Sequence, residues 1–234
     1  MTPQHIELLK STVPVLRENG VALTTYFYQR MLNNHPELNN VFNLDHQSTG
    51  RQPRALAAAV LAYADHIENP SVLVKAIENI TTKHVSLDIR PEHYAIVGDN
   101  LLHSISEVLD VPMESELIAA WKVAYLQLAD ILIGVEKQKY ENLASKAGGW
   151  AGWRKFTITH IEGSDGAKRI SLHPQDEQGI LPAQPRDYIS VRVVVPGKDL
   201  HQPQQFTFVT AQSIQYTFDV IAEQYPTEFS VANI

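Results

Sequence analysis

The sequence contains no cysteine. Disulfide bonds, cysteine-ligated zinc, cysteine-held iron–sulfur clusters and thiol catalysis are therefore excluded, and any metal must be bound by histidine, carboxylate or other oxygen ligands. Positive charge is also scarce, because 19 Lys and Arg stand against 26 Asp and Glu, for a net charge of -7 and a pI of about 5.8. This balance argues against sequence-independent binding to nucleic acid or to anionic membranes.

Several chemistry-bearing motifs are missing as well. The ten histidines form no HExxH pair, and the sequence has no GxSxG, no P-loop and no GxGxxG. Protease, hydrolase, kinase and dinucleotide-fold functions therefore have no motif to support them. No apolar run looks long enough to cross a bilayer, and the N-terminus lacks the apolar core of a signal peptide. The sequence thus predicts a cytoplasmic protein without a membrane span.

The first half of the chain has a helical pattern. From Thr2 to about Tyr140 apolar residues recur at spacings of three and four, which predicts six or seven helices packed as one α-domain. The pair Asn19-Gly20 is expected to end the first helix. Prolines that fall near later helix starts stand at positions 36, 70, 91 and 112.

The second half has a period of two. Paired glycines in the segment 144–150, AlaSerLysAlaGlyGlyTrp, break the helical pattern. Alternating apolar residues then predict antiparallel strands, and Ser164-Asp165-Gly166 is typical of a hairpin turn. We expect a small barrel, whose closure would leave no exposed edge. The expected organisation is a helical domain 1–140, a linker 141–152 and a β-domain 153–234.

His84 stands where the helical pattern calls for an apolar residue. Together with Leu73, Ile77, Ile80 and Leu87 it forms one face of a helix. An unpartnered polar group in a core costs on the order of 1–3 kcal/mol, so both ring nitrogens need partners. This apolar helix face, or seam, leaves two interpretations of His84 open. It is either a core histidine bonded to a backbone carbonyl, which is the commoner case, or a metal or haem ligand.

Other polar residues occupy inward positions on different helices. Tyr28, Gln52 and Tyr94 lie on predicted seams, and Glu136 adjoins the seam of the last long helix. Polar residues on several seams suggest a lined pocket. Taken singly, Tyr28 and Tyr94 are better explained as core tyrosines whose hydroxyls reach the surface, and Glu136 as a solvated residue near a helix end.

Five segments together carry a family resemblance. They are ProGluLeuAsnAsnValPheAsn at 36–43, Gln52-Pro53, LysHisValSer at 83–86, ArgProGluHisTyr at 90–94 and the glycine-containing segment 144–150. In combination they resemble the bacterial flavohaemoglobins, end to end through the helical half and more weakly through the β-half. The resemblance implies an all-α globin fold followed by a small antiparallel β-barrel similar to a ferredoxin-reductase-type FAD-binding domain.

The resemblance also implies a cofactor site. A haem b would be held by His84 as the ligand of its iron, with Phe42 packed against the haem face. Leu56 would limit the room for larger ligands, and Lys83 would belong to the cofactor-binding residues. On this resemblance, haem ligation replaces the interpretation of His84 as a core histidine bonded to a backbone carbonyl.

The same resemblance assigns roles to four polar residues. Tyr28 and Gln52 would lie on the distal side, where a hydroxyl can donate to bound oxygen. Glu136 and Tyr94 would bind the second nitrogen of the ligating histidine. A carboxylate in that position gives the ring anionic character and favours activation of oxygen over reversible carriage.

The implied activity is nitric oxide dioxygenation, in which NO and O₂ become nitrate with the supply of one electron. In the family that electron comes from NAD(P)H through FAD. Because the nicotinamide domain of the family is not in this sequence, the expected electron source is a separate reductase. A second function stays open, namely a haem-based gas-binding or sensing module without turnover, whose β-domain serves as a partner surface. A protein without haem is the third.

The expected FAD site departs from the family pattern. Where the family has ProGlyGlnTyr, this chain has Pro185-Arg186-Asp187-Tyr188, and Gln204 and Phe206 stand where the family has arginine and tyrosine. A glutamine lacks the positive charge and the two parallel N–H donors with which an arginine binds a phosphate. Loss of such a contact, of order 1.5–3 kcal/mol, weakens binding roughly ten- to a hundred-fold. The glycine pair expected near 226–228 is also replaced, so we hypothesise that the barrel no longer binds FAD and serves packing, partner docking or another ligand.

Overall fold

The computed structural model describes residues 1–42, 49–164, 167–182, 188–194, 200–212, 215–220 and 228–232. Contacts divide the chain into two compact units. The helical unit consists of Met1–Leu38, Leu44–Thr81 and Arg90–Val135. The barrel unit consists of Asn39–Asn43, Thr82–Ile89 and Glu136–Ile234, and so contains the end of one helix and the C-terminal part of another besides the strands.

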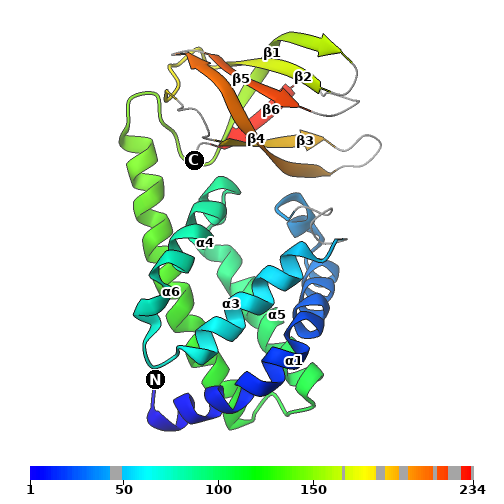
Figure 1. Ribbon diagram of the computed structural model, residues 1–234, viewed down its shortest axis with the longest axis vertical. Helices are drawn as coiled ribbons and strands as arrows, with labels where there is room; N and C mark the ends of the chain where they lie inside the picture. The colour runs from blue at the N-terminus through cyan, green and yellow to red at the C-terminus, as the bar shows by residue number, and fades with distance from the viewer. Residues whose placement is uncertain are drawn as a thin grey trace. The chain divides into compact units, whose positions relative to one another are not determined.

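The helices follow one another through the first 145 residues (Figure 1). In chain order they are α1 (Pro3–Asn34), η1 (Pro36–Asn40), α3 (Arg51–Asp65), η2 (Pro70–Leu73), α4 (Val74–Ser86), α5 (Pro91–Leu109) and α6 (Glu116–Ser145). Four of these elements begin at a proline, and the sequence predicted this for η1, η2 and α5. The fixed φ of proline suits the first helical position, and its missing N–H costs nothing there. The long last helix begins after Pro112, also as predicted.

The prediction that Asn19-Gly20 ends the first helix is wrong, because α1 runs unbroken from Pro3 to Asn34. Gly20 is buried, and a Cβ at this position would meet the Cβ of Ala57 on α3 at 3.5 Å. The glycine therefore lies on the face of α1 that packs against α3, and it does not mark a helix end. Packing of α1 against α3 outweighs the roughly 1 kcal/mol that glycine costs within a helix.

Apolar packing holds the helical unit together. Leu9, Phe27, Met31 and Ile105 are between 0% and 1% exposed. A second close approach lies at Gly98 of α5, where an added Cβ would stand 2.4 Å from the ring of Tyr125 on α6. At Gly98 the packing is so close that only hydrogen fits in place of a side chain.

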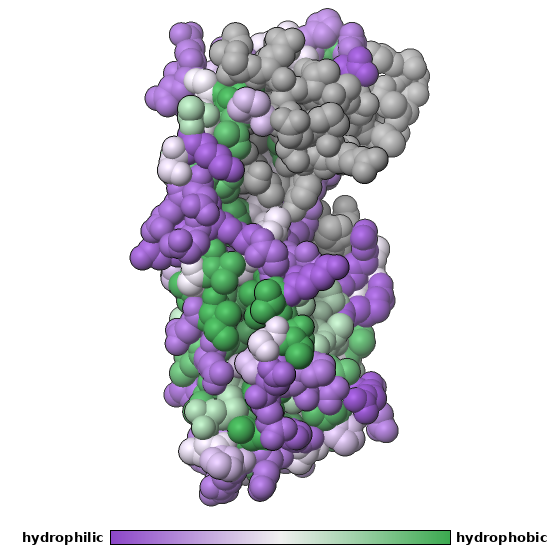
Figure 2. Space-filling model, turned by 60° about the vertical axis from the view of Figure 1, so that its left-hand side comes forward, coloured by the Kyte–Doolittle hydropathy of each residue, from purple (hydrophilic) through white to green (hydrophobic). Residues whose placement is uncertain are grey.

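Helix α6 is long and apolar enough, by length and composition, to cross a membrane, which corrects the expectation that no run would be. Its residues Ala120, Trp121, Ala124 and Leu132 are buried in the protein. A core helix passes the same test, so its length is weak support for a membrane span. On the face seen in Figure 2, apolar side chains gather over the helical region with hydrophilic ones around them.

The strands form a closed antiparallel barrel in the described part of the chain, in the order β1-β2-β5-β4-β3-β6, which confirms the predicted fold class. They are β1 (Trp153–Ser164), β2 (Ala167–Pro174), β3 (Tyr188–Val194), β4 (His201–Gln212), β5 (Gln215–Val220) and β6 (Glu228–Ala232). Phe156, Ile170, Leu172, Ile189 and Val191 are at most 1% exposed and form its core. β1 and β2 pair as far as Ser164 and Ala167. The rest of the predicted hairpin turn, positions 165 and 166, lies outside the described residues.

The segment between α6 and β1 is shaped by its glycines. The helix continues to Ser145, and Gly148 then adopts a φ of +76°. A Cβ on Gly148 would stand 2.5 Å from the backbone carbon of Ile180, so only glycine fits. The predicted helix break at the paired glycines is confirmed.

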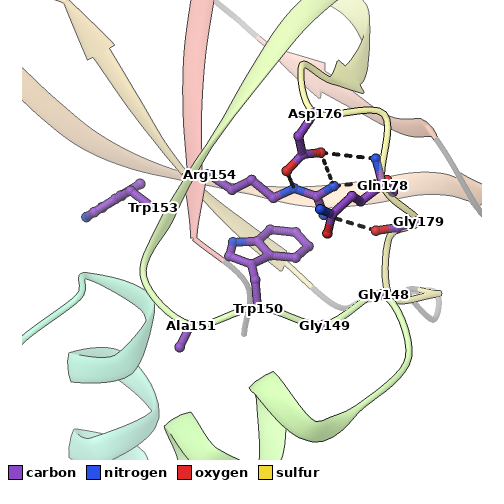
Figure 3. A pocket seen from close by; sticks show the side chains of 9 residues that line it. All are labelled: Gly148, Gly149, Trp150, Ala151, Trp153, Arg154, Asp176, Gln178 and Gly179. Atoms are coloured by element: carbon purple, nitrogen blue, oxygen red, sulfur yellow. Dashed lines mark hydrogen bonds and ion pairs between the residues drawn. The ribbon is translucent and has the colours of Figure 1, made fainter.

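A cavity of about 320 Å³ lies beside this segment and is lined by Trp150, Arg154 and Asp176 among others (Figure 3). The Arg154 guanidinium donates to both carboxylate oxygens of Asp176, and to the carbonyls of Gln178 at 2.9 Å and Gly179 at 3.0 Å. It also lies over the ring of Trp150. Because its donors are directed to protein acceptors, we interpret Arg154 as a clamp on the loop after β2.

Candidate functional site

The His84 side chain is paired with a buried carboxylate. Its Nδ1 lies 2.7 Å from Oε1 of Glu136, and the imidazole N–H donates to the carboxylate. The side chain of Glu136 is 3% exposed, whereas that of His84 is 30% exposed. Glu136 is therefore not a solvated residue at the end of a helix. A buried carboxylate that accepts one N–H of an imidazole is the usual support of a histidine that ligates a metal through its other nitrogen.

Helix α6 holds the end of α4 through two further polar contacts. Lys139 donates to the Thr82 hydroxyl at 2.9 Å, and the Tyr140 hydroxyl donates to the carbonyl of Ile89 at 2.7 Å. Together with Glu136 these residues stand at helical spacing i, i+3 and i+4, so they share one face of α6. The sequence analysis missed Lys139 and Tyr140, although their spacing from Glu136 was a usable signal.

The backbone of His84 is fixed as well as its ring. Its carbonyl accepts the N–H groups of Leu87 and Ile89, both at 3.0 Å. Asp88 between them adopts a φ of 60°, a left-handed conformation that ends the helix. The residue that presents the imidazole is therefore anchored at both ends.

Tyr28 lies on the inner side of α1. It is 9% exposed, and its ring stands edge-on to Phe27 with centroids 4.9 Å apart. Burial raises the pKa of the Tyr28 phenol. The hydroxyl therefore stays protonated at neutral pH and is a neutral hydrogen-bond donor.

The first turn of α3 carries Gln52 and, one turn later, Leu56, both half-buried. The hydroxyl of Thr24 on α1 donates to the carbonyl of Pro53 at 2.7 Å. Thr24 and Tyr28 are one turn apart on the same face of α1. This hydrogen bond therefore brings the part of α1 that carries Tyr28 alongside the turn that carries Gln52, as a shared pocket requires.

Tyr94 is buried in the first turn of α5, at 8% exposure. Its backbone carbonyl accepts a 2.6 Å hydrogen bond from the hydroxyl of Tyr125. The ring of Tyr125 lies against Gly98, so the start of α5 is held firmly to α6. The backbone that carries Tyr94 is accordingly held in place, and its side chain is buried.

Two residues expected to bind the cofactor lie in the barrel unit. Phe42 follows η1 and is half-buried. Lys83 donates from its ammonium to the amide oxygen of Gln205 on β4. Gln205 was not among the residues singled out from the sequence, and no periodic signal marks it.

The strand register separates the two glutamines of β4. Gln204 stands opposite Val191, which is fully buried, and Gln205 stands opposite Ser190. Directly opposed residues share a face of the sheet, so Gln204 shares the face of the barrel core and Gln205 the other face. The backbone of Phe206 pairs with that of Ile189. Of the other departures from the FAD pattern, Arg186 lies outside the described residues.

Among the residues that the structure describes, no three His, Asp or Glu side chains converge as they would in an all-protein metal cage. His84 presents one imidazole supported by Glu136, and a single imidazole can ligate a metal that brings its other ligands with it. A haem is such a group, since its porphyrin supplies four nitrogens.

Comparisons with known proteins agree with this geometry. The Globin family model matches residues 25–132. The flavohemoprotein of Bordetella pertussis is 49% identical over 213 residues, which cover 90% of this chain and 53% of that protein. The chain thus spans about half the length of such relatives.

Two solved structures are similar as well. The flavohemoglobin of Malassezia yamatoensis, solved with FAD and heme, superposes with a TM-score of 0.86 over 99% of this chain and 63% of that one, at 23% identity, which shows the shared fold. An engineered carbene transferase, from a Rhodothermus marinus protein provisionally described as a nitric oxide dioxygenase, is 36% identical with a TM-score of 0.58, over 62% of this chain and 99% of that one. Over about half of their length the chain is similar to flavohemoproteins, and it belongs to the globin family.

Proposed function

We propose that the protein is a haem globin that binds O₂ and NO and converts them to nitrate, with one electron per turnover supplied by a separate reductase. The observation that carries the proposal is the 2.7 Å hydrogen bond from the His84 imidazole to the buried Glu136 carboxylate. The flavohemoprotein relatives and the Rhodothermus protein support the same chemistry.

The residues present fit a haem. His84 would be the iron ligand, and Phe42, Leu56 and Lys83 would line the group. Bound there, haem supplies an iron that binds diatomic gases and exchanges single electrons. Glu136 accepts the Nδ1–H of His84, which fixes the ring orientation and raises the basicity of the ligating nitrogen. That electronic push suits oxygen activation better than reversible carriage.

Tyr28 and Gln52 would act on the gas ligand. Tyr28 is a neutral donor, and a hydrogen bond from its hydroxyl stabilises negative charge that develops on oxygen. The Gln52 amide can donate in the same way from the neighbouring turn of α3. Tyr94 would assist Glu136 in positioning His84. These four residues are our catalytic and positioning assignments.

We further propose that FAD is not a resident cofactor of this barrel. Positions 204 and 205 of β4 both carry side-chain amides, which lack the positive charge needed to pair with a phosphate. The Gln205 amide is already bonded to Lys83 and to two serines. Reconstitution with FAD followed by gel filtration checks this: a stoichiometric yellow complex would overturn it.

The enzyme proposal is tested by turnover. The haem-loaded protein, supplied with NADH and a generic flavin reductase, should consume NO in air-saturated buffer and release an equal amount of nitrate. Tyr28→Phe should keep its haem and lose O₂ faster by roughly two- to tenfold, the equivalent of one hydrogen bond of about 1 kcal/mol. Oxygen release at the parent rate would remove Tyr28 from the distal site.

The second candidate is a gas sensor without turnover, in which the barrel passes the ligation state of His84 to a partner. The observation that favours it is the set of hydrogen bonds between the end of α4 and the barrel strands. One nitrate per haem and no more, with every reductase tried, would favour this function over catalysis. Absence of a Soret band after haem addition would exclude both.

For the chain as a whole we propose a globin domain 1–140, a linker 141–152 and a barrel domain 153–234. We also propose a cytoplasmic location and O₂, NO and a reductase as partners. The acidic charge balance argues against nucleic acid as a partner.

A further inference from the structure

The side-chain amide of Gln205 joins β4 to the last turn of α4, within the barrel unit. Its oxygen accepts from the Lys83 ammonium, and its nitrogen donates to the hydroxyl of Ser86 at 2.8 Å and to that of Ser190 at 3.2 Å. Both serines are fully buried, at 0% exposure. The amide therefore satisfies polar groups that water cannot reach.

The two α4 residues bound by Gln205 stand on either side of His84 in the sequence. Lys83 precedes it, and Ser86 follows two positions later and donates from its hydroxyl to the carbonyl of Lys83 at 2.7 Å. The imidazole itself is bonded to Glu136 of α6. The last turn of α4 is thus held by α6 through the ring and by β4 through the residues around it.

Only an amide of this length can make the full set of contacts. It offers one acceptor oxygen and two N–H donors, and all three are in use. Glutamate would keep the acceptor for Lys83 but lose both donors, and leucine would lose everything while keeping most of the volume. Gln204, one residue earlier, shares the opposite face with Val191 and contributes nothing to this set.

We propose that Gln205 is a positioning residue for His84: by holding Lys83 and Ser86 it sets the position of the imidazole against Glu136. The inference rests on the proposed role of His84 as the haem ligand. It also assigns a function to the barrel. Because the coupling through the Gln205 hydrogen bonds acts in both directions, a displacement of His84 should also shift β4.

The test uses the full chain loaded with haem, and its readout is the iron–histidine stretching band of the ferrous protein in resonance Raman spectra. Gln205→Leu should shift this band to lower frequency, because the imidazole loses its fixed distance to the carboxylate. Gln204→Leu is the matched control and should leave the band in place. Glu136→Gln removes the anionic acceptor itself and should give the largest downward shift.

A second readout needs no haem. Amide exchange at Leu87 and Ile89, whose N–H groups bind the carbonyl of His84, should be faster in Gln205→Leu than in Gln204→Leu. Gln205→Glu serves as the conservative variant if the leucine variant does not fold, and it should shift the band in the same direction by less.

The possible outcomes are distinct. If Glu136→Gln moves the band but neither Gln205 variant does, the positioning role is wrong while the proposed function stands. If the parent protein retains no haem, the proposed function fails and this inference fails with it. A band that moves equally in the Gln204 and Gln205 variants would reduce the effect to general loosening of the barrel and overturn the inference.

Discussion

The core of the helical unit and the end of α4 are held together in different ways. In the helical unit, Gly98 lets α5 approach α6 until only a hydrogen fits against the ring of Tyr125, and most of the buried residues are aliphatic or aromatic. At the end of α4 the contacts are polar and specific in direction, from the Glu136 carboxylate to the Gln205 amide. Apolar packing is non-directional and fixes the fold, whereas directed hydrogen bonds fix the position of one side chain.

The largest expected effect comes from removal of that one side chain. His84→Ala should abolish haem retention, because no other described group takes the place of the supported imidazole. The Soret band is the measurement, and far-UV circular dichroism should show the helices intact. His103→Ala is the matched control, since His103 is only a partly exposed residue bonded to the carbonyl of Asp99. If His84→Ala retains haem fully, the site is misassigned.

The next largest effect is expected in the apolar core of the helical unit. Gly98→Val should destabilise the protein by about 3 kcal/mol, because its Cβ would stand 2.4 Å from a ring carbon of Tyr125. That ring cannot simply move, since its hydroxyl is bonded to the carbonyl of Tyr94. Gly134→Ala is the control: nothing lies within 4 Å of the added carbon, so a modest gain is expected. Urea denaturation measures both, and equal stabilities would show that the α5 contact is looser than described.

A smaller effect is expected on the polar side. Tyr140→Phe leaves the carbonyl of Ile89 without its donor and should cost about 1 kcal/mol of unfolding free energy. Tyr26→Phe offers a comparison, because its hydroxyl binds Glu107 at the surface and water can replace it. The difference between the two variants in urea denaturation measures the value of fixing the end of α4. A greater loss from Tyr26→Phe would contradict this view of the site.

The smallest effect concerns the Arg154 clamp and depends on pH. The hydrogen bond from Arg154, the largest cause, lowers the pKa of Asp176 below its ordinary 3.8. A depressed carboxyl pKa stabilises the folded state above that ordinary value, and the contribution disappears as the pH falls through the lower, folded-state pKa. Asp176→Asn should therefore reduce stability slightly at pH 7 and converge with the parent under acid conditions. Parallel stability curves of the two proteins across this acid range would rule the ion pair out as the cause.

Much of the fold could be predicted because it depends on local rules. Prolines at helix starts and alternation along strands such as Ile189 to Val193 act through neighbouring residues, and both were read correctly. The meaning of Gly20 could not be read in the same way. Its effect depends on Ala57, a residue far along the chain whose position is decided by tertiary packing.

The residues of the candidate site also differ in whether local sequence patterns or only tertiary packing reveals them. The anomalous polarity of His84 in an apolar seam is a local signal, and the resemblance to a family supplied its distant partner Glu136. Gln205 gives no local signal, because a single glutamine within a strand is common. Its role depends on the register of β4 against β3 and on contact with α4, which no spacing rule predicts.

The double anchoring of the His84 carbonyl has a practical consequence for protein engineering. Two amide groups hold this backbone position independently of the side chain, so an exchange of the histidine for another metal-binding amino acid should leave the local main chain where it is. The variants then differ only in the length of the side chain at position 84 and in the atom that it offers to the metal. Position 84 is therefore a defined platform for testing how the identity of an axial ligand alters the reactivity of a porphyrin metal.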